Sequence, residues 1–365
     1  MIVKHNFDTM NFSPFIDEGS MDSTNVRIRI NTEFLDSCKF NCAGCYVKRK
    51  NEFTDSDVDV LVHAIQMFRE SGASFDEVIL GPTDFFSASN TEEVLSHEGF
   101  KSIFKDGDVV LTILTTLQEP EERIKELIQC VNDNLTHPNM EMEVLIPFDI
   151  ARVVNKDPFY VMEMKRKIQI LNLLNPTVDY AMQINIHDVD KMIPGFSLPE
   201  VTRYVRDTFG TIVEFNPSFM RVKKPHIITK VLDDWNDMLE RHMDQLQAED
   251  ITFTMVNKYH ASYNELTYNF KDGYLYVCPF IYENVVDLSD AFKIERQGEY
   301  YVIDDINAKD VSVIGDQYEY SSEVECATCE FQGSCVGKKV LYYMKQYDIA
   351  KCVVSKPVMA YYGTQ

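Results

Sequence analysis

The sequence predicts an α/β fold in which parallel strands alternate with helices, followed by a smaller α+β domain. Between residues 26 and 248, short apolar stretches alternate six times with helical stretches, which is the pattern of repeated βαβ units. From about residue 249, short alternating strands and turn signals replace this pattern. With 365 residues, of which 45% are hydrophobic, the chain can bury one large core and a second, smaller one.

The first predicted strand, 26–30, alternates apolar and polar residues and leads directly into a loop with three cysteines. Thr54 is expected to cap the helix that follows this loop. Asp55 and Asp57 lie in its first turn, where carboxylates suit the positive end of the helix dipole. Further strands are expected at 77–80, 109–117, 141–146, 180–186 and 211–215, and helices at 120–134, 158–174 and 199–209.

The helix after the sixth strand has the clearest periodicity. Its apolar residues recur at helical spacing and indicate core packing: Ile228, Val231, Leu232, Trp235, Met238, Leu239, Met243 and Leu246. Further on, Asp272-Gly273 separates two alternating segments and predicts a β-hairpin. We therefore expect an N-terminal extension at 1–25, an α/β domain at 26–248 and a C-terminal domain at 249–365.

Charge and hydropathy limit the partners and the compartment. The net charge is −23, and such a surface repels nucleic acids and anionic membranes. The chain has no apolar run long enough to span a bilayer and no apolar segment typical of a signal peptide. We expect a cytoplasmic protein with no nucleic-acid or membrane partner. In that reducing compartment, the nine cysteines are expected to be metal ligands rather than partners in disulfide bonds.

Three cysteines near the start of the chain form a Cys-x3-Cys-x2-Cys run: Cys38, Cys42 and Cys45. The next cysteine is Cys130, which is expected to be a core thiol. Three thiolates on one loop leave one iron of a four-iron cluster with an open position, and an open iron can bind a substrate. A structural zinc site is the alternative, but it usually needs a different spacing and a local fourth ligand.

This run resembles the cysteine motif of the radical S-adenosylmethionine (SAM) enzymes. The resemblance implies a SAM-binding 4Fe-4S cluster, reductive cleavage of SAM to a 5′-deoxyadenosyl radical, and hydrogen abstraction from a substrate. It also implies that the six βα units form a partial (β/α)6 TIM-like barrel, with the cysteine loop at the C-terminal rim, where such barrels hold their chemistry. Phe40 and Tyr46 flank the thiols and are expected to exclude water, or simply to pack there.

A second group of cysteines resembles the SPASM extension of this superfamily, which implies one auxiliary 4Fe-4S cluster in a small α+β iron–sulfur domain. A structural zinc knuckle stays an alternative there. The implied ligands are Cys326, Cys329, Cys335 and Cys352. Lys339 stands where a further family cysteine is expected, and only Cys278 is present from the family's inner cluster. Cys278 is expected to be spare, either as a hydrogen-atom donor in catalysis or as a buried hairpin residue.

The resemblance also implies which residues bind SAM. Gly81-Pro-Thr-Asp84 stands where the family has Gly-Gly-Glu-Pro, so Asp84 is a candidate for the amino group of SAM or, alternatively, a capping residue in a turn. Arg152 is the candidate for the carboxylate, or a surface ion pair. The polar residues on the last strands of the barrel suit the ribose or a buried hydrogen-bond network: Gln183, Asn185 and Asn216.

We therefore expect a radical SAM enzyme whose substrate is a peptide or protein side chain. Its expected partner is an electron donor such as flavodoxin or ferredoxin. A radical SAM enzyme on a small polar metabolite and a non-catalytic iron–sulfur carrier are the alternatives. Because about 25 residues precede the first strand, we expect no N-terminal leader-binding domain.

Overall fold

The computed structural model describes residues 27–36, 38–40, 53–70, 74–81, 83–106, 108–135, 137, 140–147, 157–175, 177–185, 198–210, 212–216, 225–248, 252–253, 265–271, 274–276, 291–297, 300–304, 352 and 355–357. These residues belong to two compact units. One unit contains Met1–Val144, Ile170–Asp179 and Asn264–Asp316, and the other contains Leu145–Gln169, Tyr180–Tyr263 and Gln317–Gln365. No described helix is both long and apolar enough to cross a membrane.

The sheet of the first unit has the strand that precedes the cysteines near its middle. β1 (Arg27–Thr32) pairs in parallel with β2 (Ser74–Leu80) on one side and with β8 (Glu265–Lys271) on the other. β2 pairs in parallel with β3 (Val110–Leu114), and β4 (Met142–Pro147) follows in the sheet. Beyond β8 the sheet continues with three antiparallel strands: β9 (Tyr274–Tyr276), β10 (Ala291–Gln297) and β11 (Tyr300–Asp304).

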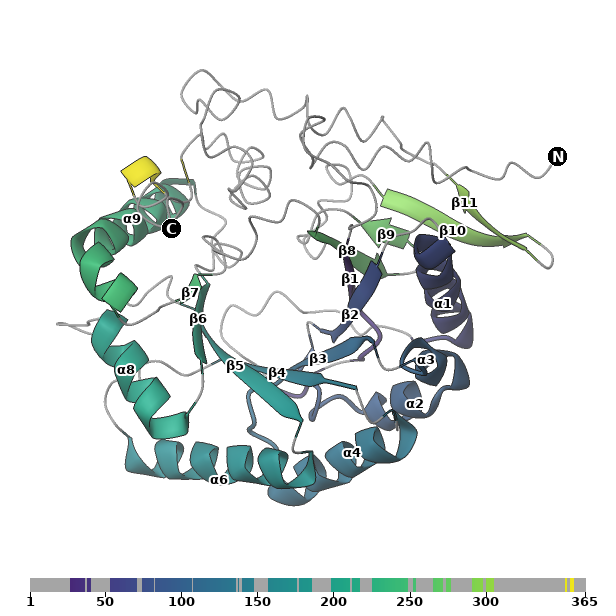
Figure 1. Ribbon diagram of the computed structural model, residues 1–365, viewed down its shortest axis with the longest axis horizontal. Coiled ribbons are helices and arrows are strands. Elements are labelled where there is room, and N and C mark those ends of the chain that lie inside the picture. Colours follow the sequence, from purple (N-terminus) through teal and green to yellow (C-terminus); the bar gives the residue numbers. More distant parts are fainter. Residues whose placement is uncertain are drawn as a thin grey trace. The chain divides into compact units, whose positions relative to one another are not determined.

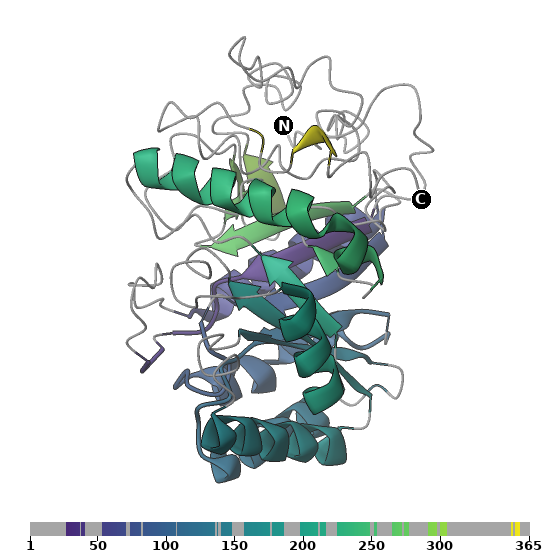
Figure 2. The same ribbon diagram turned by 90° about the vertical axis from the view of Figure 1, so that its left-hand side faces the viewer.

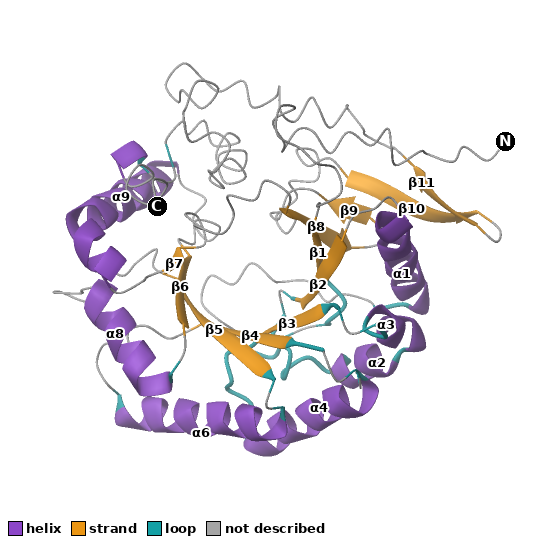
Figure 3. Cartoon of the chain, viewed as in Figure 1, coloured by secondary structure: helices purple, strands orange, loops and turns teal. Residues whose placement is uncertain are grey.

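Four helices of this unit lie along one side of the strands β1–β3 (Figures 1 and 3): α1 (Asp55–Glu70), α2 (Thr91–Ser96), α3 (Glu98–Ile103) and α4 (Glu121–Asn134). The predicted start of α1 is confirmed, because the Thr54 Oγ1 accepts a hydrogen bond from the Asp57 backbone N–H at 3.3 Å. α4 turns one apolar face to the core, with Ile124, Leu127, Ile128 and Val131 buried.

Helices and parallel strands also alternate among the elements that lie wholly or mostly in the second unit. β5 (Val178–Asn185) pairs in parallel with β6 (Ile212–Asn216), which pairs with β7 (Thr252–Phe253). The helices are α6 (Pro158–Leu174), α8 (Leu198–Phe209) and α9 (Pro225–Ala248), whose length is best seen in Figure 2. The predicted core face of α9 is confirmed in its middle part, where four of its side chains are buried: Leu232, Trp235, Met238 and Leu239. Met243, further along the same face, is only half-buried.

A cluster of aromatic rings fixes the chain where β1 ends. Phe34, two residues beyond β1, is only 3% exposed. Its ring makes edge-to-face contacts with Phe53, Phe100 and Phe270, at centroid distances of 5.6, 6.4 and 5.7 Å. These partners come from the start of α1, from α3 and from β8. The entry to the cysteine loop is therefore anchored in the core.

The predicted α/β class, with parallel strands and helices in alternation, is confirmed. Closure into a partial barrel and the domain boundary at residue 249 stay predictions. The hairpin predicted around Asp272-Gly273 is confirmed by the antiparallel pairing of β8 with β9. The pattern of the sequence missed α2 and α3, and it made β3 too long, because Thr115 and Thr116 turn away to bond with Asp84.

Candidate functional site

The first cysteine of the predicted cluster motif lies just beyond the C-terminal end of β1. Cys38 is half-buried, and its sulfur accepts two hydrogen bonds. The Ser87 hydroxyl donates at 3.2 Å, and the Phe40 backbone N–H donates at 3.4 Å. Hydrogen-bond donors directed at a sulfur are typical of the surroundings of a metal-bound cysteine. Cys38 therefore fits the role of a cluster ligand.

The chain between β1 and Cys38 is fastened to the segment Thr83–Asn90, which follows β2. The Asn90 side chain bonds to both neighbours of Leu35: its Nδ2 donates to the Phe34 carbonyl at 2.8 Å, and its Oδ1 accepts from the Asp36 N–H at 2.9 Å. The Asp36 carboxylate accepts from the Ser89 N–H at 2.9 Å and from the Ser89 hydroxyl. These bonds fix where the cysteine loop leaves the sheet.

Asp84 is the centre of the post-β2 segment. Its side chain is buried and accepts hydrogen bonds from the N–H groups of Phe86 and Ser87, each at 3.1 Å, and from the N–H of Thr116 at 2.6 Å. The hydroxyls of Thr115 and Thr116 also donate to it. Burial raises the pKa of the Asp84 carboxyl, and the hydrogen bonds from Thr116, Thr115 and Ser87 act in the opposite direction.

A second acidic group lies beside the cysteine loop. Glu119 follows β3, its side chain is only 2% exposed, and it forms an ion pair with Lys39, the residue after Cys38. Its Oε1 atom is buried without a hydrogen-bond partner in the described part of the chain. Glu119 was not predicted as a site residue, because a lone acid in a loop carries no periodic signal. The pair brings the loop after β3 onto the cysteine loop.

Gly81 directly follows β2, and its N–H donates to the Thr32 carbonyl at 3.3 Å. A Cβ atom at this position would lie 2.4 Å from the Leu114 Cδ1 atom and 3.3 Å from the Asn31 Oδ1 atom. The end of β2 therefore runs too close to its neighbouring strands for a side chain. Gly81 and Asp84 thus lie at the same edge of the sheet as Cys38, as their positions after parallel strands require.

In the second unit, β5 and β6 end together. Asn185 pairs directly with Asn216 in the parallel register, and Gln183 pairs with Glu214. The three predicted polar residues are therefore neighbours at the C-terminal ends of two strands. Cys352 is held to α9, because its carbonyl accepts a bond from Asn236 Nδ2 at 3.3 Å, and Ser355 N–H donates to Asn236 Oδ1 at 2.7 Å.

The other predicted site residues lie outside the described residues: Cys42, Cys45, Tyr46, Arg152, Cys278, Cys326, Cys329 and Cys335. Among the residues that the structure does describe, no group of three or more His, Cys, Asp or Glu side chains is placed to hold a metal ion. Cys130 on α4 is half-buried, burial raises the pKa of its thiol, and Asn134 Nδ2 donates to the sulfur at 3.3 Å.

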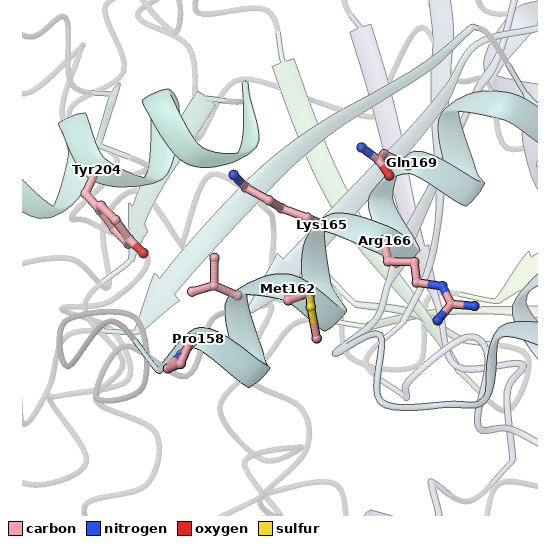
Figure 4. A pocket seen from close by; sticks show the side chains of 7 residues that line it. Pro158, Met162, Lys165, Arg166, Gln169 and Tyr204 are labelled. Carbon is pink, nitrogen blue, oxygen red and sulfur yellow. The ribbon is translucent and has the colours of Figure 1, made fainter.

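A hollow of about 550 Å³ between α6 and α8 is separate from these residues (Figure 4). Lys165 projects from α6 and Tyr204 from α8 into this region, and the other lining residues are Pro158, Val161, Met162, Arg166 and Gln169. Of the predicted site residues that the structure describes, none lines this hollow.

No family model matches the sequence, and no curated protein matches it. Among solved structures, the chain is similar to SuiB from Streptococcus suis bound to the precursor peptide SuiA. The identity is 10% and the TM-score 0.48, over 86% of this chain and 72% of that chain. SuiB bound to S-adenosylmethionine matches at 9% identity with a TM-score of 0.46, over 90% and 76% of the two chains. At these TM-scores the likeness is too loose to assign a function.

Proposed function

We propose that this protein is a radical SAM enzyme that cleaves S-adenosylmethionine reductively and modifies a peptide or protein side chain. The observation that carries the proposal is the environment of Cys38. It begins a Cys-x3-Cys-x2-Cys run, it follows the C-terminal end of a parallel strand, and its sulfur receives two hydrogen bonds. A spacing that leaves one iron open thus coincides with a strand end where two hydrogen-bond donors are directed at the first cysteine sulfur.

When bound, a 4Fe-4S cluster on Cys38, Cys42 and Cys45 supplies the electron that splits SAM and so generates the 5′-deoxyadenosyl radical. The chain's own residues position the cluster. Asp36 and Asn90 hold the stem of the cysteine loop. Tyr46 and Phe40 are proposed to exclude water around it.

The proposed SAM contacts come from residues at the ends of parallel strands in each unit. Gly81, at the end of β2, is proposed to contact SAM through its backbone. Asn185 and Asn216, which are register partners, carry amides of the kind that suits ribose hydroxyls. Gln183 and Arg152 complete this set, with the Arg152 guanidinium for the carboxylate. Asp84 contributes on the side of the cluster loop.

The auxiliary cluster and the substrate class rest on the second cysteine group. Cys352 is proposed as a ligand together with Cys326, Cys329 and Cys335. The bonds that attach its segment to Asn236 of α9 support that role, because they fix the backbone at this cysteine. S-adenosylmethionine and a precursor peptide are the molecules bound in the two SuiB structures, and they are the same two classes that we propose here. A flavodoxin or a ferredoxin is the proposed electron donor.

The test is metal content and SAM cleavage after anaerobic reconstitution. We expect roughly eight irons per chain in the wild type, from two four-iron clusters, and about half after replacement of Cys38, Cys42 and Cys45 by Ala. With a strong one-electron reductant, the wild type should release 5′-deoxyadenosine and methionine, and the triple variant should not. Cys130→Ala is the matched control, because Cys130 lies on α4 outside both cysteine groups, and it should keep both properties.

Each competing function gives a different result. Equal SAM cleavage by the wild type and the triple variant would refute the radical SAM proposal. If the protein held zinc in place of half of the iron, the proposal of an auxiliary cluster would be refuted, and the proposal of the SAM-binding cluster would stand. If mass spectrometry showed a modified small polar metabolite and no modified peptide, the radical SAM proposal would stand and the proposed substrate class would change.

A further inference from the structure

The Ser87 hydroxyl is a polar group that the proposed catalytic scheme leaves without a role. Ser87 lies between β2 and α2, and its side chain is 8% exposed. Its hydroxyl donates to the Cys38 sulfur across 49 residues of sequence, at 3.2 Å. This bond places a hydroxyl donor directly on the sulfur of the first cysteine of the proposed cluster motif.

Asp84 controls the position of this hydroxyl. The Asp84 carboxylate accepts the backbone N–H of Ser87 at 3.1 Å, and the same N–H also donates to the Asp84 carbonyl at 3.1 Å. The other carboxylate oxygen is fixed to the end of β3 through the Thr116 N–H at 2.6 Å. Through Asp84, the backbone of Ser87 is therefore tied to the segments that follow β2 and β3. These bonds restrict the movement of the Ser87 hydroxyl away from the Cys38 sulfur.

A hydrogen bond to a metal-bound sulfur withdraws electron density from it. The reduced cluster carries one more negative charge than the oxidised cluster, so the same bond stabilises the reduced form more. Removal of the donor therefore makes the cluster harder to reduce. The Phe40 N–H at 3.4 Å is a second, longer donor to the same sulfur and belongs to the backbone, so only the Ser87 bond can be removed by a substitution.

We propose that Ser87 sets the reduction potential of the SAM-binding cluster through its O–H···S bond to Cys38, and that Asp84 acts as the positioning residue for this bond. The inference rests on the proposed function, because it needs the cluster on Cys38. On this proposal, the segment after β2 adjusts how easily the SAM-binding cluster accepts one electron. The external donor supplies the electron, and Ser87 itself exchanges neither an electron nor a proton.

The test is a redox titration of the reconstituted holoenzyme, followed by electron paramagnetic resonance. The signal that changes when SAM is added identifies the SAM-binding cluster. Ser87→Ala should shift its midpoint potential to a more negative value at unchanged iron content. Ser87→Thr keeps a hydroxyl on the same carbon and should retain the wild-type potential. Ser96→Ala is the matched control and should change nothing, because Ser96 is exposed on α2 and its hydroxyl donates to the Glu93 carbonyl at 3.1 Å.

The outcomes separate this inference from the proposed function. A wild type without a SAM-responsive cluster signal refutes the proposed function itself. A normal wild type with the same potential in Ser87→Ala overturns only the role of Ser87. If Ser87→Ala loses its iron, then retention of iron and potential in Ser87→Thr supports the hydrogen bond, whereas equal loss in both variants means that the position serves packing and overturns the inference.

Discussion

Replacement of Asp84 by Ala should destabilise the protein even before any cofactor is bound. The substitution leaves the N–H groups of Phe86 and Thr116, now bonded to the carboxylate at 3.1 and 2.6 Å, without acceptors near the core. The Ser87 N–H keeps its bond to the Asp84 carbonyl. A buried donor left unsatisfied costs about 1–3 kcal/mol, so two of them lower the free energy of unfolding by about 2–6 kcal/mol. Asp84→Asn should cost less, because the amide keeps one oxygen acceptor and has no charge to bury.

Urea unfolding of the metal-free protein measures this difference, with an unchanged slope as the sign that the unfolded state is the same. Asp133→Ala is the matched control, since Asp133 is exposed on α4 and its loss should stay within about 0.5 kcal/mol. An Asp84→Ala protein within about 1 kcal/mol of the wild type, with weakened SAM binding, would contradict this reasoning. In that case the carboxylate would serve the amino group of SAM and not the fold.

Three further predictions concern other residues. Phe34→Ala should lower the free energy of unfolding by about 3–5 kcal/mol, because a buried ring with three ring contacts is lost. Phe159, which is 76% exposed, is the control. In the same urea titration, Phe159→Ala should lower the free energy of unfolding by about 0.5 kcal/mol or less. Cys352→Ala should lose the auxiliary cluster and Cys278→Ala should keep both clusters; iron analysis that shows the reverse would mean that Cys278 is the ligand. Because burial raises the pKa of the Cys130 thiol, less of it is thiolate at pH 8 than in an ordinary cysteine, and mapping of iodoacetamide-labelled peptides should show slower labelling in the folded than in the urea-unfolded protein.

Local patterns in the sequence predicted those elements whose cause is local. The Thr54 cap, the buried face of α9 and the β8–β9 hairpin each depend on residues within a few positions of one another. The helices α2 and α3 were missed because each has only six residues, too few to show a period. Their position depends on Asp84 and Asn90, which bond to residues far away in the sequence.

The candidate site was predictable to the same extent. The cysteine spacing identified Cys38, and Gly81 and Asp84 were selected only because they stand where the resembled family has its Gly-Gly-Glu-Pro segment. Ser87, Asp36 and Glu119 could not be found, because their contacts to the cysteine loop span roughly 50 to 80 residues and depend on the pairing of β1, β2 and β3. A serine in a turn has no pattern that distinguishes a sulfur-binding hydroxyl from a solvated one.

The parallel pairing of β1 with β8 has a consequence for how the protein is made. β1 is among the first described segments to leave the ribosome, yet the Phe270 carbonyl that accepts the Glu33 N–H at 3.1 Å is synthesised long after it. At about 5–20 residues per second, one edge of β1 waits roughly 10–50 s for its partner strand. Until then the nascent chain exposes an open strand edge beside the cysteine loop, which is a hazard for aggregation. Under the proposed function, a cluster can therefore be loaded into the finished loop only after residue 270 has been translated.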